Sequence, residues 1–526
     1  MRPFVRAVDR LSDALAVVAA VLLVAASIVI TWSVVYRALG NSTFWEIEFS
    51  VYMMVASLFL ASPYTLKTSG HVGVDLLSHY LPQRWRTRLA IAVAIVGLLI
   101  LVVTLFVLFS GLPIAWGLTL VSVGFLIVFQ GFASIANVPI VMMDELASFA
   151  LLTIPLFVLL GAAIGSSAAG RDIYESLHRW LARVPGGLVI ANILACGVFS
   201  AICGSSPATA AAIGKAGVPE MLRRGVSPAL ATGSICAGGT LGILIPPSIT
   251  MILYGLATET SIGRLFLAGI VPGILLVVLF SLYAWIATLV SRRGLEVEDR
   301  GYTLGEKMQG LGRVSPFIAI IIAIAYAMYG GLATPSEVAA ISAVLALMLV
   351  VAIYRAWRAD DLWRIMSETV RESTMILMII GAAAIFSYMM SLLYVTQTAA
   401  QALVDLGLNR WVLMLAINAF LLLAGCFLPP VAIIVMVMPI LTPVLEANGF
   451  DLIWFAVILT INMEVGLITP PVGLNLYVLK GVAPQVPLTT VLLGAMPFVA
   501  IMLLTMVLLA IFPGIATWLP NQMMGG

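Results

Sequence analysis

Two short segments of this chain combine glycine, a pair of adjacent prolines and small polar residues within apolar sequence. The first runs from Gly238 to Ser248 and the second from Glu464 to Gly473. Proline has no N–H and clashes with the preceding turn, so each pair is expected to interrupt a helix. Such a break frees carbonyl groups that suit a sodium ion and N–H groups that suit an anion. Both segments are therefore predicted to bind ligands through their backbone.

The two segments belong to an internal duplication. Gly242 and the pair Pro246–Pro247 recur as Gly466 and the pair Pro470–Pro471 at one constant separation. Gly and Pro are also common in membrane helices that merely pack together, and a single break would fit that interpretation equally well. Two matched breaks favour a functional role. Repeats that each carry a broken helix are typical of secondary transporters, whose site lies at the membrane midplane.

Each break follows a charge-free segment with an unusual length. Val184 to Gly214 and Trp411 to Leu445 are both too long for one membrane crossing and too short for two with a turn. They are interrupted at Cys203–Pro207 and at Pro429–Pro430 respectively. We interpret both as re-entrant hairpins, which require a tip that is buried in protein or lines a cavity. The hydroxyls of the first tip could complete the oxygen shell of an ion or bind a substrate.

The composition supports a membrane protein with many spans. Of the 526 residues, 62% are apolar and only 10% are charged, which excludes a soluble domain. Arg2, Arg6 and Arg10 precede an apolar run that is too long for a signal peptide, so a retained first helix is expected. The formal net charge of +2 provides no field for nucleic acid. The four cysteines and three histidines show no metal or redox spacing, and no cofactor is predicted.

The positive charges predict the orientation. Lysine and arginine gather in residues 67–88, 292–313 and 355–371, which are therefore assigned to the cytoplasm. Between the last two segments there is room for two helices, from Pro316 to Arg355, with Thr334 capping the second. Counting spans from these loops makes the first hairpin enter from the cytoplasm and the second from outside. The two repeats are thus predicted to have opposite orientations.

At these motifs the sequence resembles the membrane component of the tripartite ATP-independent periplasmic (TRAP) transporters. The resemblance rests on Phe199–Gly214 in the first hairpin, on Gly238–Gly269 in the first broken helix and, most specifically, on Asn462–Gly481. The N-terminal part resembles the small subunit of the family through Trp45–Glu48 and Gly70–Leu77. The sequence therefore looks like a fusion of the small and large subunits.

The resemblance implies an all-α polytopic membrane protein, an inverted-repeat elevator-type transporter with two re-entrant hairpins and two broken helices. Residues 1–104 would be a truncated small-subunit-like module and 105–526 the transport module, with repeats at about 149–291 and 372–515. Counting spans from the charges leaves the topology of about 89–131 open. At Pro429 the family often has an aspartate, which places any acidic ligand at the second tip in doubt.

The function implied is sodium-coupled import of a small organic acid across the bacterial inner membrane. The partners would be a periplasmic substrate-binding protein, the organic anion and membrane lipid, and no nucleotide is hydrolysed. The sodium ligands predicted are Ser205, Ser206, Gly238 and Gly242 at the first break, and Glu464, Gly466 and Thr469 at the second. The substrate contacts predicted are Gly204, Pro207, Thr209, Pro246, Pro247, Ser248, Pro470, Pro471 and Asn475.

Two alternatives of other classes remain open at this point. A passive channel for small anions would line a continuous pore with polar residues. An intramembrane enzyme would need a Ser-Lys, Asp-Asp or His-metal group, and the sequence offers none that is convincing. A secondary transporter is the leading hypothesis, and the protein is not predicted to be an enzyme.

Overall fold

The computed structural model describes residues 2–38, 46, 49–57, 60, 96–110, 112–291, 302–393 and 409–524. Within these ranges the chain forms helices and no β-strand. By length and composition, seven of the described helices could cross a membrane, and counting each of two bent helix pairs as one span gives up to nine. The predicted all-α polytopic architecture is confirmed.

The helices fall into three groups along the chain. The N-terminal group is α1 (Arg2–Ala38), α4 (Val96–Phe109), α5 (Ile114–Gln130) and α6 (Asn137–Leu146). The first half of the duplicated part of the chain is α7 (Thr153–Gly165), α8 (Ala169–Leu181), α9 (Gly187–Cys203), α10 (Ser206–Arg223), α11 (Pro228–Leu244), α12 (Ile249–Ala257) and α13 (Ile262–Ser291). After α14 (Leu304–Tyr329) and α15 (Pro335–Tyr354), the second half is α16 (Ala359–Leu392), α18 (Arg410–Gly425), α19 (Pro430–Ala447), α20 (Leu452–Leu467), α21 (Leu474–Val482), α22 (Leu488–Ile511) and α23 (Gly514–Met524).

Helix bounds in the two halves follow the spacing of the sequence duplication. The first residues of α10 and α19 are separated by the same number of positions as Pro246 and Pro470, and so are the last residues of these helices. The first residues of α11 and α20 keep this separation as well. The pairs α9–α10 and α18–α19 thus form equivalent hairpins. The repeat boundaries at 149–291 and 372–515 remain predictions.

Both broken helices are interrupted where the proline pairs predict. The first break separates α11 from α12, which are bent by 41°. The second separates α20 from α21, and the peptide bonds Pro246–Pro247 and Pro470–Pro471 are both cis.

Two predicted boundaries differ from the structure. The first hairpin does not end at Gly214, because α10 continues to Arg223. Glu220 pairs with Arg223 and Arg224 in the last turn, and such contacts three and four residues apart stabilise a helix end. Likewise, α14 begins at Leu304 rather than near Pro316, since Thr303 and Glu306 form a capping box that starts a helix.

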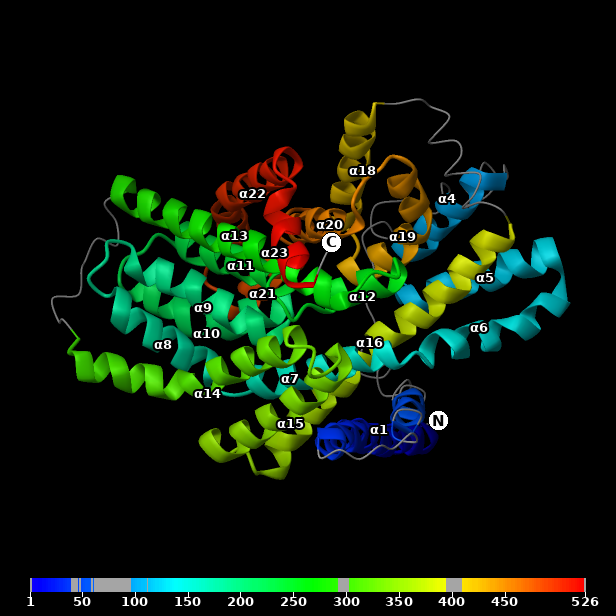
Figure 1. The fold of residues 1–526 in the computed structure, drawn as a ribbon, viewed down its shortest axis with the longest axis horizontal. Coiled ribbons are helices and arrows are strands. Elements are labelled where there is room, and N and C mark those ends of the chain that lie inside the picture. Colours follow the sequence, from blue (N-terminus) through cyan, green and yellow to red (C-terminus); the bar gives the residue numbers. More distant parts are fainter. Residues whose placement is uncertain are drawn as a thin grey trace.

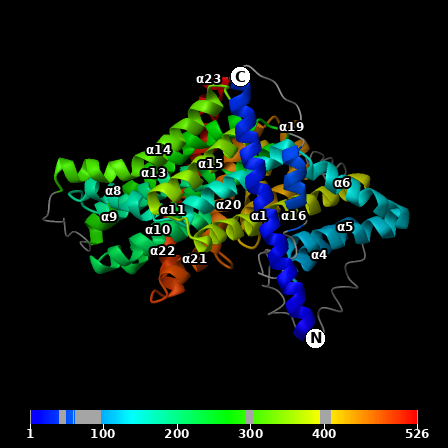
Figure 2. The ribbon, with the colours of Figure 1, turned by 90° about the horizontal axis from the view of Figure 1, so that it is seen from below.

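The N-terminal module contacts the middle of the chain. Helix α1 packs against α15 and α16, and the Ser27 hydroxyl donates a hydrogen bond to the Ala340 carbonyl at 3.1 Å. Figure 2 shows α1 crossing the molecule beside α15 and α16. The cap predicted at Thr334 is confirmed, because its hydroxyl accepts a hydrogen bond from the Glu337 N–H. In the segment 89–131, whose topology the charges leave open, α4 begins at Val96, while 89–95 and Gly111 lie outside the described residues.

The two small-subunit motifs of the N-terminal module are almost entirely outside the described residues. Of Trp45–Glu48 only Glu46 is described, and its side chain is buried. None of Gly70–Leu77 is described.

The long helix α16 packs against three helices that precede it in the chain, α5, α6 and α7. In Figure 1, α5, α6 and α16 extend together toward one end of the molecule, while α1, α14 and α15 lie along one edge.

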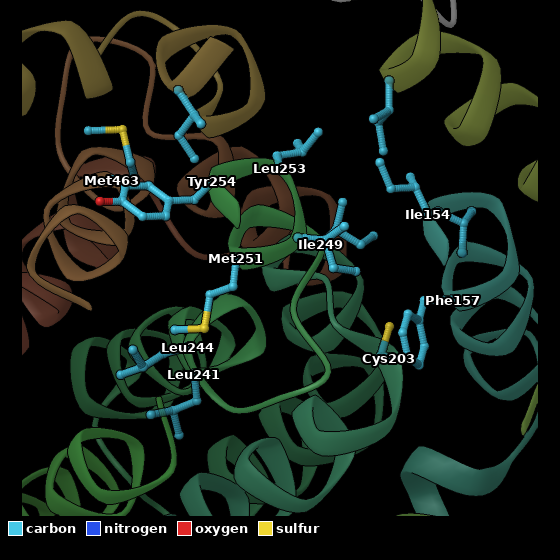
Figure 3. Packing of buried hydrophobic residues seen from close by; sticks show 14 of the residues in the cluster. Ile154, Phe157, Cys203, Leu241, Leu244, Ile249, Met251, Leu253, Tyr254 and Met463 are labelled. Carbon is cyan, nitrogen blue, oxygen red and sulfur yellow. The ribbon is translucent and has the colours of Figure 1, made fainter. Parts of the chain in front are cut away.

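The two halves are joined by a hydrogen bond from a buried tyrosine. The Tyr254 hydroxyl on α12 donates to the Leu452 carbonyl at the start of α20, at 2.7 Å. Figure 3 shows its ring directed toward the second half, next to Met463. The Tyr254 side chain is only 1% exposed, so water cannot replace its hydroxyl. Removing the hydroxyl therefore leaves the Leu452 carbonyl without this donor.

Replacing Tyr254 with phenylalanine is expected to lower the free energy of unfolding by about 1 kcal/mol, the typical net contribution of such a hydrogen bond. Thermal unfolding in detergent measures this loss. Tyr326→Phe is the matched control, since the Tyr326 side chain on α14 is 71% exposed. Equal melting temperatures for the two variants would contradict the prediction.

Candidate functional site

The tip of the first hairpin packs directly on the first helix break. Gly204 ends α9 with φ of 63°, and a Cβ atom at this residue would lie 2.7 Å from the Pro247 carbonyl oxygen. A Cβ atom at Gly242 would lie 2.7 Å from the Ser205 carbonyl oxygen. Contacts this short are incompatible with any side chain larger than a hydrogen atom. The chain can therefore bring tip and break together only with glycine at these positions.

The second hairpin meets the second break in a similar way. The Val472 N–H donates to the Cys426 carbonyl at 3.2 Å, and the Cys426 thiol lies 3.2 Å from the Thr469 hydroxyl oxygen. A Cβ atom at Gly466 would lie 2.8 Å from the Cα atom of Gly425. Each hairpin tip therefore lies against the broken helix of its own half.

A cluster of three polar side chains connects the two halves. The Ser206 hydroxyl, in the first turn of α10, donates to Glu464 Oε2 on α20 at 3.0 Å. The Asn475 amide on α21 donates to Ser206 Oγ at 2.8 Å and reaches the Cys236 carbonyl at 3.5 Å. All three side chains are at most 1% exposed. The first turn of α10, the second helix of the first hairpin, is thus hydrogen-bonded to α20 and α21, which lie on either side of the second break.

This cluster has more acceptors than donors. Glu464 Oε1 and Asn475 Oδ1 are buried and have no hydrogen-bond partner. The proton of the Ser206 hydroxyl is used by Glu464 Oε2, and the Asn475 amide protons are directed at Ser206 Oγ and Cys236 O. Buried acceptors without partners are rare in proteins and indicate either a functional role or a bound group.

The predicted sodium ligands are arranged differently from their grouping in the sequence. Ser206 and Glu464, assigned to different breaks, are hydrogen-bonded to each other. A Cβ atom at Gly238 would lie 2.7 Å from Cys196 Sγ, so this glycine packs closely against α9. The Thr469 hydroxyl donates to the Val465 carbonyl at 2.8 Å, within its own helix end.

Several predicted substrate contacts are occupied by local hydrogen bonds. The Ser248 hydroxyl is buried and accepts a hydrogen bond from the Met251 N–H, which caps α12. The Thr209 hydroxyl, also buried, donates to the Ser205 carbonyl at 2.9 Å. The remaining predicted contacts differ in exposure: Gly204, Pro247 and Asn475 are buried, Pro207 and Pro246 are half-buried, and Pro470 and Pro471 are exposed.

A cavity of about 510 Å³ opens beside the first hairpin tip. Ser205 and Cys203 line its wall together with residues of α7, α8 and α16. Figure 3 shows the Cys203 side chain facing the Phe157 ring of α7. Three cationic and two acidic side chains also line it: Arg171, Lys215, Arg364, Glu368 and Glu372. From the sequence alone, these charged residues were not identified as part of a site. The only local sign of them in the sequence is the presence of cations in the segments that form α8, α10 and α16.

Comparison with known families and proteins identifies the chain. Residues 99–515 match the family described as the tripartite ATP-independent periplasmic transporter, DctM component. Residues 26–168 match the DctQ component of the same transporters. The two matches overlap between residues 99 and 168.

Individual relatives agree with these matches. The chain is 36% identical over 388 residues to the C4-dicarboxylate TRAP transporter large permease protein DctM of Pseudomonas aeruginosa, covering 74% of this chain and 90% of that protein. It is 32% identical over 405 residues to the isethionate TRAP transporter permease protein DctMQ of Oleidesulfovibrio alaskensis, covering 77% of this chain and 63% of that protein.

A solved structure supports the fold. The Alcanivorax borkumensis YdaH transporter superposes with a TM-score of 0.56 at 17% identity, covering 81% of this chain and 99% of that one. The matched relatives are transport permeases, so the protein is a membrane permease and not an enzyme. The chain belongs to the tripartite ATP-independent periplasmic transporters, with the DctQ and DctM components fused in one polypeptide.

Proposed function

We propose that the protein imports a small organic acid across the bacterial inner membrane, driven by a sodium gradient. The acid is delivered by a periplasmic substrate-binding protein. The two hairpins and broken helices move as one unit against a scaffold that includes α14, α15 and α1, in an elevator mechanism. The names of the C4-dicarboxylate and isethionate relatives support a small organic anion as substrate.

The observation that carries this proposal is the contact between hairpin tips and helix breaks. Each tip lies against the break of its own half, and Ser206 connects the first tip to the second break. Interrupted helices place backbone carbonyls and N–H groups where a cation and an anion can bind in a region without water. We propose that sodium binds at both breaks, near Ser205, Ser206, Gly238 and Gly242 and near Glu464, Gly466 and Thr469.

The substrate is proposed to lie between the two tips. Gly204, Pro207 and Thr209 come from the first tip, and Pro246, Pro247 and Ser248 from the first break. Pro470, Pro471 and Asn475 complete the set from the second break. In the present conformation the hydroxyls of Ser248 and Thr209 bond locally, so substrate binding there would use backbone groups or require these hydroxyls to turn.

Uptake into proteoliposomes tests the proposal. With the cognate binding protein outside, we expect accumulation of labelled substrate only when sodium is higher outside than inside. Without the binding protein or without the sodium gradient, accumulation is expected to fall to the level of empty vesicles. A thermal-shift screen of the binding protein against organic acids identifies the substrate to be used. Accumulation that persists without sodium would eliminate the coupling.

The same vesicles distinguish a carrier from the passive anion channel. A carrier that alternates between two sides exchanges labelled for unlabelled substrate without net flux, and its rate saturates. A channel dissipates the gradient and shows no such exchange. Saturable counterflow is therefore expected.

A further inference from the structure

We propose that a second cavity, formed by α8, α10 and Tyr302 just before α14, binds a phosphate group. This α8–α10 cavity has a volume of about 460 Å³. It adjoins the cavity beside Ser205, because Arg171 and Lys215 line both. In Figure 1, α8 lies beside both α10 and α14. None of the lining residues belongs to the proposed sodium or substrate sites, so the phosphate site goes beyond the proposed function and does not depend on it.

The charge of the lining favours an anion. Five cationic side chains line the α8–α10 cavity with only two acidic ones, Glu175 and Glu220, which leaves an excess of three positive charges. The cations are Arg171, Arg179, Lys215, Arg223 and Arg224. Positive side chains gathered around a concave surface concentrate anions there. Four of the five are arginines, whose planar set of N–H donors matches the oxygen atoms of a phosphate group.

Two of these cations have no acidic partner. Both acidic side chains are already paired with arginines three or four positions away in the sequence. Neither Lys215 on α10 nor Arg179 on α8 forms an ion pair in the described part of the chain. Arg179 instead donates to the Glu306 carbonyl at 2.9 Å, which holds its guanidinium group in place. A bound phosphate group would compensate the charge of both cations.

A buried tyrosine in the cavity wall points independently to a ligand. Tyr174 is 4% exposed, and its hydroxyl makes no hydrogen bond with the residues that the structure describes. Its ring stacks on the His178 ring, with 6.0 Å between the ring centroids, and the Tyr302 ring meets His178 edge-on at 6.2 Å. The aromatic contacts thus fix the position of the hydroxyl. Buried hydroxyls without partners are rare, and a phosphate oxygen in the cavity would accept this proton.

The surroundings favour a lipid headgroup as the source of the phosphate. Tyr302 lies in the segment 292–313, which the positive charges assign to the cytoplasm. On α8, Trp180 is 45% exposed, and Lys307 Nζ lies 5.4 Å from the centroid of its ring. An exposed tryptophan is typical of the interface between membrane and water, and basic pockets at this level bind anionic headgroups. The expected ligand is an anionic phospholipid, and a soluble phosphate compound is the alternative source.

Two titrations test the site and identify the source. Purified full-length protein in detergent is titrated with phosphatidylglycerol, and bound lipid is counted by native mass spectrometry. Separately, protein in nanodiscs of phosphatidylcholine is titrated with radiolabelled inorganic phosphate. Neither titration contains transport substrate or a sodium gradient. The wild type is expected to bind phosphatidylglycerol at one site per chain.

Tyr174→Phe is the decisive variant. It is expected to weaken binding of phosphatidylglycerol about tenfold, because a hydrogen bond to a charged group is lost. Its melting temperature without added ligand should not fall, since the hydroxyl that it removes has no partner in the described chain. A purely structural tyrosine would not produce this combination.

Lys215→Gln is a second variant with little risk to folding, because Lys215 is exposed. Loss of one partly solvated cation is expected to weaken binding about threefold. Lys307→Gln is its matched control, since Lys307 is close to α8 but does not line the α8–α10 cavity. Binding to this control should equal binding to the wild type.

Each outcome decides for or against the site. Weaker phosphatidylglycerol binding in both cavity variants, but not in Lys307→Gln, supports the lipid site, and the same pattern with inorganic phosphate alone supports a soluble phosphate compound. Equal affinities in the wild type and both cavity variants overturn the site. An equal loss in Lys307→Gln indicates unspecific attraction and also overturns it. Binding of labelled succinate, but of neither phosphate probe, would assign the cavity to a transported acid and overturn the phosphate site. Sodium-dependent uptake by the wild type tests the proposed function separately.

Discussion

Replacement of Gly466 by alanine is expected to reduce sodium-driven uptake at least tenfold while the protein still inserts into the membrane. The added Cβ atom would lie 2.8 Å from the Cα atom of Gly425, and other backbone atoms of Gly425 are closer still. Backbone atoms cannot rotate away as a side chain can, so the second hairpin tip must separate from the break. Forcing an extra methyl group into such a contact typically costs 1–3 kcal/mol, and about 1.4 kcal/mol corresponds to a factor of ten.

The control for this variant is available in the next helix segment. Gly481 on α21 has no atom within 4 Å of the position that a Cβ atom would occupy, so Gly481→Ala should transport normally. Gly242→Ala is the equivalent test in the first half, where the added atom meets the Ser205 carbonyl oxygen. Initial rates of uptake at several sodium concentrations provide the measurement. Wild-type rates in Gly466→Ala would show that the contact between tip and break is not needed for transport.

The second large effect is expected for Ser206→Ala, through weaker sodium coupling. The substitution removes a buried hydroxyl that donates to Glu464 Oε2 and accepts from the Asn475 amide. Leaving buried polar groups without partners costs about 1–3 kcal/mol. The sodium concentration for half-maximal uptake should therefore rise about tenfold, or more where the ion also loses an oxygen ligand. The size of the side chain hardly changes, so expression should remain normal.

Ser234→Ala is the matched control for this prediction. Ser234 is as fully buried as Ser206, but its hydroxyl donates only to the Ala231 carbonyl of its own helix. Loss of that bond affects a single local contact and should leave the sodium dependence unchanged. If both variants have the sodium dependence of the wild type, Ser206 only packs between the helices and is not part of the ion site.

The helix breaks and several helix ends were determined by the sequence itself. Two consecutive prolines remove two N–H groups and clash with the preceding turn, so the pairs at Pro246 and Pro470 interrupt their helices through local chemistry. The same is true of the cap at Thr334, where the residue and its partner Glu337 lie within one turn. The family motifs lie in these local segments, so the sequence was also sufficient to recognise a TRAP permease.

The grouping of the polar residues was decided only by the tertiary structure. Sequence proximity associated Ser206 with Gly238 and Gly242, and Glu464 with Thr469, whereas the folded chain pairs Ser206 with Glu464 and Asn475. Hydrophobic periodicity shows which face of a helix is apolar, but not which distant helix covers it. The approach of α10 to α21 depends on packing between the two halves.

The cavity beside Ser205 also came only from the folded chain. Its charged lining combines residues from α8, α10 and α16, which are far apart in sequence and show no common pattern there. Lysine and arginine residues near membrane helices are usually interpreted as cytoplasmic anchors. Their sequence positions therefore do not indicate that they also line a cavity. Local chemistry thus specified where this chain bends and breaks, while long-range packing of nearly uniform apolar helices decided which polar side chains meet.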